Sequence, residues 1–251
     1  MNRLLKILFV VFGLCGCTGA FAGMLSATYF AIDNTDPSYN QLCCSTLSDE
    51  VLGTLGPDGL PLLNPAYVGN SYAPRAGDLY STGSGNEITW WSPALNSHVT
   101  QIGTDTVSLP INNPWDFFPC VANGAYACND SMAGLAAVYS GTLIAPTTEQ
   151  ISFSIGADDS AFAYLDGNIV CDLGGVHGFS NGNCVTPFNI AAGSHSLQIF
   201  FVDMNQVQSG LYFGINTEGV TTEPSSVPEP GSIALLGIGL LGLAFVRVKN
   251  S

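Results

Sequence analysis

GADDSAFAYLDGNIV, residues 156–170, contains the strongest fold signal in the sequence. Asp166-Gly167 separates two apolar runs, which is the clearest short-range signal for a β-hairpin closed by a two-residue type I′ turn. Side chains alternate between the two faces of a strand. For the run before the turn, we therefore expect one face with Phe162 and Tyr164, and another with Ala161, Ala163 and Leu165.

Two adjacent acidic residues, Asp158 and Asp159, stand directly ahead of this hairpin. Neighbouring carboxylates repel each other, and on a regular strand they would point to opposite faces. This position does not suit a plain strand, so both residues are candidates for a functional site. The alternative is that they cap a loop by accepting hydrogen bonds from backbone amides.

The remaining sequence predicts short strands separated by loops rich in Gly, Pro, Asn and Ser. We expect strands at residues 24–32, 87–92, 98–103, 136–144, 149–156, 160–165, 168–173, 185–190, 195–203 and 210–216. Residues 33–87 and 104–131 predict long loops with little regular structure. No long stretch between the two ends of the chain has helical periodicity. The predicted fold class is all-β, an antiparallel β-sandwich or barrel with long loops that place function at one end.

Residues 1–22 have the order of parts of a secretory signal peptide. Arg3 and Lys6 precede an apolar run, and Ala20-Phe21-Ala22 forms a small-x-small cleavage site for signal peptidase. A lipoprotein signal, with Cys17 as the lipidated residue, is the second interpretation. We rank it lower because the alanine site is good and the other end of the chain already supplies an anchor.

Residues 228–251 contain three parts in order. Pro228-Glu229-Pro230 is followed by an uncharged apolar stretch, 231–246, and then by Arg247 and Lys249. That stretch predicts a short transmembrane helix, since a span usually needs about 17–25 residues, and the trailing cations fit a cytoplasmic end. The ordered triplet resembles the PEP-CTERM sorting signal of exopolysaccharide-producing Gram-negative bacteria. The resemblance implies recognition and removal by a membrane-bound exosortase, with delivery to the cell surface or extracellular matrix.

Between these ends we expect one domain, residues 23–217, and a polar linker, residues 218–227. This length is enough for one sizeable core. Eighteen of the nineteen acidic residues lie between the two targeting segments, against a single basic residue, Arg75. Such a charge balance excludes a nucleic-acid or anionic-membrane surface. Acidic solubility is the simplest explanation, and cation binding is the sharper one if some of the acids converge.

Six cysteines remain after removal of the signal peptide, and an even number indicates disulfides in an exported chain. They are Cys43, Cys44, Cys120, Cys128, Cys171 and Cys184. Adjacent cysteines are poorly placed to bond each other. We therefore expect Cys171 to pair with Cys184, and Cys43 and Cys44 to pair with Cys120 and Cys128. A zinc site is less suited, because no CxxC or HxxxH spacing occurs.

The second half of the chain resembles the lectin-like domain family named after anthrax protective antigen (PA14), and most closely its fibro-slime branch. An ordered set of segments carries this resemblance: AVYSGTL at 137–143, QISFSI at 150–155, Asp158-Asp159, AYLDGNIV at 163–170, DLGGVHG at 172–178, AGSHSL at 192–197 and IFF at 199–201. GMLSATYF at 23–30 is similar to the family's opening strand, whereas residues 33–131 do not match. The resemblance implies a β-sandwich with a shallow sugar site at one end.

A calcium site also follows from this resemblance. Adhesin members of the family hold calcium with two adjacent aspartates joined by a cis peptide bond, so Asp158 and Asp159 are the implied metal and ligand-binding residues. Asp203 matches an Asn ligand position, and the loop after it would supply the backbone carbonyls of Asn205 and Val207. Sugar hydroxyls would complete the shell, because calcium takes 6–8 oxygen ligands.

Several other polar residues have simpler interpretations. Asp166 is expected to be a turn residue, and Asp172 to cap the next loop. His177, in the GGVHG segment, is expected to order a glycine-rich loop through a hydrogen bond. His98 and His195 have no partner pattern. The three tryptophans could offer a stacking face for sugars, although core packing or loop anchoring suits them better; they are Trp90, Trp91 and Trp115.

Residues 178–182 match the G-x-S-x-G pattern of serine hydrolases. A nucleophile elbow needs a strand before it, a helix after it, and then an acid and a histidine. Here no acid lies between Ser180 and His195. A glycosidase pair needs carboxyl groups about 5 Å or more apart, which adjacent aspartates sharing one ion do not offer. We therefore expect a protein that is not an enzyme.

The sequence thus predicts an exported, surface-sorted bacterial protein with a calcium-assisted carbohydrate-binding or adhesive domain. Its partners would be signal peptidase and exosortase during export, and then an extracellular glycan or exopolysaccharide. The helix at 231–246 would anchor it in the membrane at least transiently, and its location would be the cell surface, outer envelope or matrix. The alternative is a structural, exopolysaccharide-associated matrix protein without a specific small ligand.

Overall fold

The structure, a computed structural model, describes residues 23–39, 41, 43–113, 133–185, 188–205 and 209–225. The predicted signal peptide, the PEP-CTERM signal and the helix expected at 231–246 lie outside these residues, as do Trp115, Cys120 and Cys128. Across the described part of the chain, no helix has the length and apolar character needed to cross a bilayer.

An antiparallel sheet of thirteen strands forms the larger layer of the fold, and its main path runs β5-β6-β4-β3-β13-β12-β17-β9-β1-β7. Its strands are β1 (Met24–Asp33), β2 (Ser45–Leu47), β3 (Val51–Leu55), β4 (Pro61–Leu63), β5 (Leu79–Thr82), β6 (Gly85–Ile88), β7 (Val99–Ser108), β9 (Ala133–Ala145), β12 (Ser160–Leu165), β13 (Asn168–Val176), β15 (Asn183–Cys184), β17 (Gly193–Asp203) and β19 (Thr221–Pro224). β2 and β15 pair with β13, and β19 pairs with β9. The predicted all-β, antiparallel class is confirmed.

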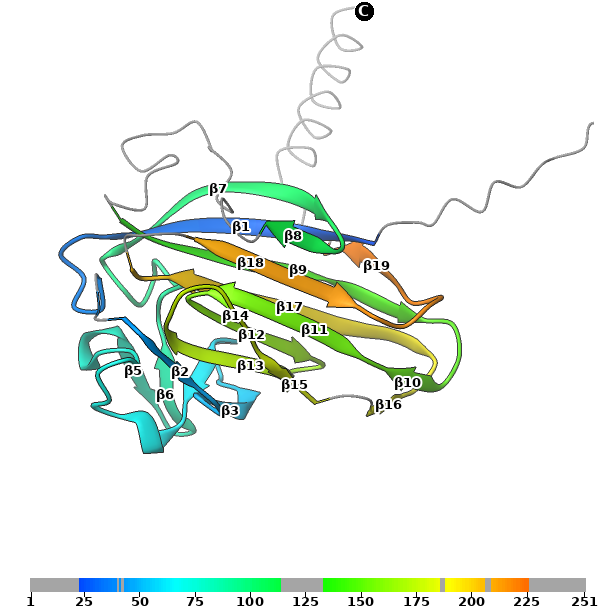
Figure 1. Cartoon of the computed structure of the whole chain (residues 1–251), viewed down its shortest axis with the longest axis horizontal. Helices are drawn as coiled ribbons and strands as arrows, with labels where there is room; N and C mark the ends of the chain where they lie inside the picture. The colour runs from blue at the N-terminus through cyan, green and yellow to red at the C-terminus, as the bar shows by residue number, and fades with distance from the viewer. Residues whose placement is uncertain are drawn as a thin grey trace, which may run out of the picture.

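A smaller sheet faces the larger one and completes a sandwich (Figure 1). Its order is β14-β11-β18-β8, formed by β14 (Ser180–Asn181), β11 (Phe153–Asp158), β18 (Gly210–Ile215) and β8 (Ile111–Asn113). A separate ribbon joins β10 (Glu149–Ile151) to β16 (Phe188–Ile190). One hydrophobic core contains Ile155 and Phe213 of the smaller sheet together with Ala163, Ile199 and Phe201 of the larger. Burial of these alternate side chains holds the two layers together.

The predicted hairpin is formed by β12 and β13. Leu165 pairs with Asn168 across the turn. Asp166 and Gly167 have φ angles of 50° and 74°, and a type I′ turn requires positive φ at both central residues. The local sequence signal for this turn is therefore confirmed.

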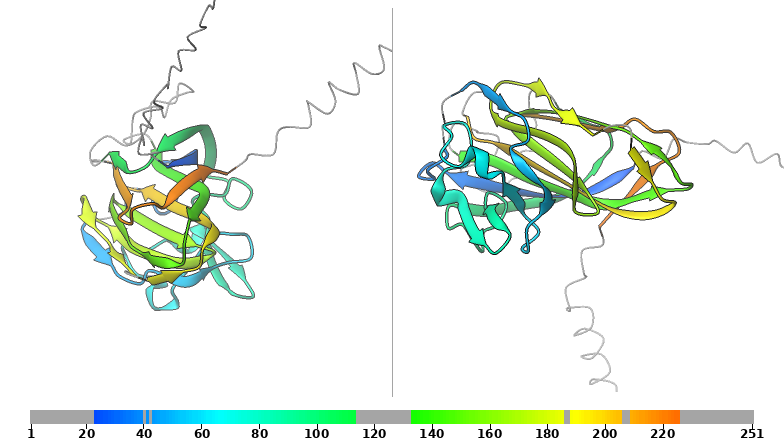
Figure 2. Two further views of the ribbon diagram at one scale, coloured as in Figure 1. Left: turned by 90° about the vertical axis from the view of Figure 1, so that its right-hand side faces the viewer. Right: turned by 90° about the horizontal axis from the view of Figure 1, so that it is seen from below.

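The second face of β12 is buried as well. Phe162 and Tyr164 belong to a second hydrophobic core with Trp90, Trp91 and Phe200, whereas the alternate residues of β12 belong to the core between the sheets. The predicted division of this strand into two faces is confirmed, and both tryptophans are core residues. The cover for this second face comes from residues 43–98, whose strands β2–β6 gather at one end of the sandwich (Figures 1 and 2).

The expectation of long loops over residues 33–87 is wrong. This segment contains β2, β3, β4, β5, the start of β6 and two 3₁₀ turns, η1 (Pro65–Tyr67) and η2 (Ala76–Asp78). Its strands have only 3–5 residues, too short for an alternating pattern to stand out from the sequence. The segment is ordered because its apolar residues, such as Val51 and Leu63, are buried in the second core.

Other element boundaries also differ from the expectation. The strand expected at 87–92 ends at Ile88, because Trp90 and Trp91 lie in a turn. The strand expected at 149–156 divides into β10 and β11. Within the expected linker, Thr221–Pro224 forms β19, which pairs with Gly141–Ile144 of β9. Few apolar residues occur in this last strand, so its sequence did not indicate pairing.

The disulfide between Cys171 and Cys184 is present, with an S–S distance of 2.04 Å, and it joins paired positions of β13 and β15. The expected bonds from Cys43 and Cys44 to Cys120 and Cys128 are not what the structure records. Cys43 and Cys44 instead form a disulfide with each other. The peptide bond between them is cis and their Cα atoms are 3.1 Å apart, which brings the two side chains closer together than we expected for adjacent cysteines.

Candidate functional site

The two adjacent aspartates lie where the chain passes from one sheet to the other. Asp158 ends β11 in the smaller sheet, and Ser160 begins β12 in the larger. Ser160 pairs with Val202, so the next residue of β17, Asp203, lies beside Asp159. The peptide bond between Asp158 and Asp159 is cis, as the family resemblance implies.

Three carboxylates meet at this point. One oxygen each from Asp158, Asp159 and Asp203 lies within 4.8 Å of the others. Their residues are 5%, 1% and 1% exposed. The structure thus brings Asp203 together with the aspartate pair, and its role as a metal ligand stays a prediction.

Backbone amides hold the Asp159 carboxylate in place. Its Oδ1 accepts a hydrogen bond from the backbone N–H of His177 at 2.8 Å, and its Oδ2 accepts from those of Met204 and Asn205 at 2.9 and 3.1 Å. The Asn205 N–H also donates to Asp203 Oδ1 at 3.2 Å. The loop-capping role considered from the sequence is thus present at Asp159, and it fixes where the carboxylate lies.

Burial dominates the electrostatics of this group. Desolvation raises the pKa of Asp159 to about 6, while its hydrogen bonds with the amides of Met204, His177 and Asn205 act to lower it. Buried carboxylates this close repel each other unless a proton or a cation neutralises them.

The donor set fits a hard divalent cation. Calcium–oxygen bonds measure about 2.3–2.6 Å, so two oxygens on one calcium ion lie within roughly 5 Å of each other. The three carboxylates satisfy this limit. Three carboxylate oxygens do not fill a shell of 6–8, and backbone carbonyls or a ligand's hydroxyls would supply the remainder. Asn205 borders the site, whereas Val207 lies outside the described residues.

A cavity of about 390 Å³ opens beside the carboxylates. It is lined by Cys43, Cys44, Asp158, Asp159, His177, Gly178 and Asn205. The cavity therefore combines acidic groups from the sandwich with a pair of cysteines from the segment that the family resemblance did not cover. Nothing in the sequence pattern signalled that these cysteines would reach the aspartates.

His177 orders the loop beside this cavity, as predicted. Its backbone N–H donates to Asp159, and its Nδ1 lies 2.9 Å from the carbonyl oxygen of Gly178. Burial lowers the pKa of the imidazole, which favours the neutral ring. The Asp159 contact connects the GGVHG segment directly to the site.

Asp172 and Asp166 have structural roles, and each contacts a segment more distant in the sequence than we expected. The carboxylate of Asp172 accepts hydrogen bonds from the backbone N–H groups of Glu50 and Val51 at 3.3 and 3.1 Å. Asp172 therefore caps a loop more than 100 residues away, not the next loop. Asp166 lies in the hairpin turn and also contacts His195, with 2.7 Å between Oδ2 and Nδ1.

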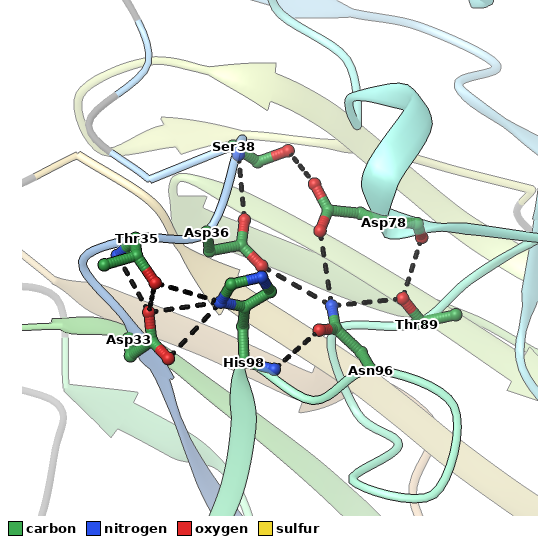
Figure 3. A network of polar contacts seen from close by, with 8 residues as sticks. All are labelled: Asp33, Thr35, Asp36, Ser38, Asp78, Thr89, Asn96 and His98. Carbon is green, nitrogen blue, oxygen red and sulfur yellow. Dashed lines mark hydrogen bonds and ion pairs between the residues drawn. The ribbon is translucent and has the colours of Figure 1, made fainter.

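His98 belongs to a second polar network, shown in Figure 3. Its Nδ1 lies 3.2 Å from Asp33 Oδ1. Close by, Asn96 Nδ2 donates to Asp36 and Asp78 at 3.4 and 3.2 Å. The Oδ1 atom of Asn96 accepts a hydrogen bond from the backbone N–H of His98 at 2.9 Å. That last bond fixes the amide group with its donors toward the acids.

This second network is structural. Asp78 also accepts a hydrogen bond from the hydroxyl of Ser38, and Asp36 accepts from the Ser38 backbone N–H. Burial raises the pKa of Asp78 to about 7, with a further contribution from the nearby Asp36. Hydrogen-bond donors from Ser38 and Asn96 face these carboxylates. The network therefore joins the loops around residues 36, 78 and 96 and does not form an open cation site.

The G-x-S-x-G segment has no hydrolase geometry. Ser180 begins the short strand β14, its hydroxyl donates to the Gly178 carbonyl oxygen at 3.0 Å, and strand β15 follows in place of a helix. The backbone conformation of a nucleophile elbow is therefore absent from this described segment.

Taken together, the fold and the site define an antiparallel β-sandwich with a buried tri-aspartate cluster at one end. Residues 226–248 match the family described as the PEP-CTERM protein-sorting motif. The chain therefore carries the motif of exported proteins that are sorted to the cell surface, as its sequence predicts. No curated protein is found to be similar to the chain.

Solved structures similar to the chain include three domains. The PA14 domain of MpAFP antifreeze protein has 12% identity and a TM-score of 0.42, covering 84% of this chain and 95% of that one. The PA14 sugar-binding domain from RTX adhesin has 12% identity and a TM-score of 0.36, covering 79% and 92%. The epithelial adhesin 9 A domain from Candida glabrata, in complex with Galβ1-4GlcNAc, has 13% identity and a TM-score of 0.35, covering 79% and 85%. At these TM-scores and identities, none of the three assigns a role to a residue of this chain.

Proposed function

We propose that this protein is a surface-sorted binding module in which calcium, held by the tri-aspartate cluster, presents a coordination site to an extracellular carbohydrate. The observation that supports this most is the convergence of Asp158, Asp159 and Asp203 within 4.8 Å, beside a cavity that the first two of them line. Three buried acids together are costly, and a divalent cation offsets that cost by neutralising them at once.

Loop capping alone does not account for the cluster. Three backbone N–H groups already serve the Asp159 carboxylate, so a cap would need no further acid beside it. Asp158 and Asp203 bring two more carboxylates to the same point. A calcium ion would be held by all three carboxylates, and sugar hydroxyls in the neighbouring cavity would supply further oxygen ligands.

The sorting motif gives the domain its place of action. An exosortase would recognise Pro228-Glu229-Pro230 and release the domain to the surface or matrix, where glycans and exopolysaccharide are the abundant ligands. We propose adhesion, without an enzymatic step. The second candidate, a matrix protein with no specific ligand, is favoured by the capping role of Asp159, which a purely structural loop would also use.

Calcium titration of the mature domain tests the metal. We expect calorimetry on residues 23–225 to show one calcium site, and Asp158→Asn and Asp203→Asn each to weaken it strongly. Calcium should also stabilise the fold, by about 2.7 kcal/mol at a hundredfold excess over Kd. Asp105→Asn is the matched control, because Asp105 is an exposed acid of β7 outside the cluster.

Carbohydrate binding is tested separately on a glycan array, with calcium and with chelator. We expect signals that need calcium and disappear in Asp158→Asn. A domain that binds no calcium at millimolar concentration contradicts the metal site. Calcium binding with an empty array in both conditions would favour the matrix role instead.

A further inference from the structure

The cavity beside the aspartates has a disulfide in its wall. Cys43 and Cys44 are bonded to each other and both are exposed. They line the same cavity of about 390 Å³ as Asp158 and Asp159. The bonded cysteine pair therefore borders the space next to the carboxylates.

The cysteine pair is held from both sides. Before it, the carbonyl oxygen of Gln41 accepts a hydrogen bond from Asn205 Nδ2 at 3.0 Å, and Asn205 is itself bonded to Asp159 through its backbone. After it, Ser45 pairs with Val176 in the β2–β13 ladder, directly ahead of His177. The residues that flank the disulfide are thus attached to the two segments that hold the Asp159 carboxylate.

The described lining of this cavity contains no Phe, Tyr or Trp. Trp90 and Trp91, the tryptophans near this end of the fold, are 3% and 4% exposed and belong to the second core. Binding pockets combine a few placed polar groups with apolar surface. Here the soft, polarizable sulfur atoms of the Cys43–Cys44 ring are the apolar surface beside the acids.

We propose that the Cys43–Cys44 disulfide is the apolar wall of the ligand site and sets its specificity. The inference rests on the proposed function. While two hydroxyls of a pyranose bind the metal ion, the non-polar C–H face of the sugar packs on the disulfide. The wall therefore favours sugars that can place two hydroxyls on the ion and, at the same time, their apolar face on the disulfide.

Export makes this wall durable, because disulfides persist in oxidising compartments outside the cytosol. A dithiol reductant would remove it in a balanced two-electron step. The S–S bond breaks, Cys43 and Cys44 each become a thiol, and the reductant becomes a disulfide. The two thiols are then free to separate, and the packed face of the sugar loses its surface.

The pairing can be tested with trypsin. In a domain of residues 23–225, Arg75 is the only Lys or Arg. Non-reducing digestion therefore yields the fragment 23–75, which contains Cys43 and Cys44 and no other cysteine. We expect this fragment to be released with a mass two hydrogens below that of its dithiol form. If it stays linked to the remainder until reduced, the cysteines pair with Cys120 or Cys128 and the proposal is overturned.

Binding measurements test the role of the wall. We expect the double variant Cys43→Ser/Cys44→Ser to bind calcium like the wild type, because no carboxylate is changed. Its affinity for the sugar that the wild-type domain selects on the array should fall by about tenfold or more, the scale of lost apolar contact in a pocket. Ser45→Ala, an adjacent change in the same segment, is the matched control and should keep full affinity.

The outcomes separate the two proposals. If the wild type binds a sugar and the double serine variant binds it equally well, the disulfide wall is wrong and the proposed function stands. If the wild type binds calcium but no sugar, the proposed function and the wall both fail. A melting curve of the serine variant close to that of the wild type shows that loss of sugar binding is not loss of the fold.

Discussion

Asp166 has the turn role that the sequence predicts and also makes contacts that the sequence does not indicate. Its positive φ and its neighbour Gly167 form the predicted turn. Its carboxylate also accepts the backbone N–H of Ser196 at 2.8 Å and contacts His195 Nδ1 at 2.7 Å. His195 Nε2 lies 3.0 Å from the carbonyl oxygen of Ala191. Both ring nitrogens thus face acceptors, an arrangement that suits the doubly protonated imidazolium.

This geometry gives a pH-dependent prediction for Asp166→Asn. Asn-Gly keeps the type I′ turn, so the change removes mainly the charge. The hydrogen bond that the His195 ring donates to the Asp166 carboxylate raises the pKa of His195 above its ordinary 6.5. The stabilisation is therefore complete below pH 6.5 and is lost as pH rises through the folded-state pKa. We expect Asp166→Asn to lower the melting temperature at pH 5.5, and the gap to wild type to narrow by pH 8.5.

Thermal melts across this pH range provide the measurement. Asp105→Asn, which removes an exposed acid of β7, controls for the change in net charge. If the difference in melting temperature between Asp166→Asn and wild type is the same at both pH values, Asp166 acts through the turn and Ser196 alone.

At the scale of elements, β13 joins the sandwich to the segment that covers its second face. Glu50 is fully buried and its Oε2 accepts the backbone N–H of Gly175 at 2.5 Å. A Cβ on Gly174 would overlap the Glu50 side chain, and Gly175 has a φ of 94°. Glycine at both positions therefore lets the loop before β3 (Val51–Leu55) approach the strand closely.

The protonation of Glu50 controls this contact. Burial, with a further contribution from Asp172, raises its pKa from 4.5 to about 8. The group is then neutral in the folded protein at pH 7. The stability that it contributes is complete below pH 4.5, falls as the pH rises above that value, and is lost once the pH passes the folded-state pKa of about 8. Glu50→Gln keeps an acceptor for Gly175 and cannot ionise. We expect the urea midpoint of Glu50→Gln, measured relative to that of wild type at the same pH, to be higher at pH 9 than at pH 6.

Other acids with raised pKa values, such as Asp78, titrate in both proteins and cancel in the difference. A Glu50→Gln variant that is less stable than wild type by the same amount at pH 6 and pH 9 would show that Glu50 is already ionised at pH 6.

The sequence predicted those elements whose signals are local. The turn at Asp166-Gly167, the two faces of β12 and the long strands β1, β9 and β17 each follow from spacing or alternation within a dozen residues. The sequence did not predict strands β2–β5, because each has only 3–5 residues. They are ordered by packing on Phe162 and Tyr164, a contact between segments about 100 residues apart that no local pattern records.

The candidate site divides in the same way. Asp158 and Asp159 stood out because two adjacent acids do not suit a strand, and Asp203 followed from the family resemblance. Cys43 and Cys44 reach the cavity through the β2–β13 pairing and the Gln41–Asn205 hydrogen bond. Both contacts join the unmatched segment to the matched one, so neither spacing nor resemblance could predict them.

At the scale of the whole molecule, the C-terminal motif determines where the domain acts. Residues 226–248 match the PEP-CTERM protein-sorting motif, and the described chain reaches residue 225. We expect replacement of Pro228-Glu229-Pro230 by alanines to leave the folded domain unchanged and to prevent its delivery to the surface. Cell fractionation with an antibody to the domain measures this.

Calcium binding by the purified variant domain controls for the fold. Unchanged surface delivery of the alanine variant would show that the triplet is not what the sorting machinery reads in this protein.

The position of β19 (Thr221–Pro224) has a mechanical consequence. β19 pairs with Gly141–Ile144 of β9, whereas Asp203 pairs with Leu135 at the other end of the same strand. The chain leaves β19 at Pro224, which pairs with Gly141. Six residues of strand separate Gly141 from Leu135 and extend about 20 Å, so the exit of the chain and the aspartate cluster are separated along β9. A load applied between the aspartate cluster and the chain that leaves Pro224 would pass lengthwise along β9 and would act in shear on the hydrogen bonds to its neighbours β1 and β17.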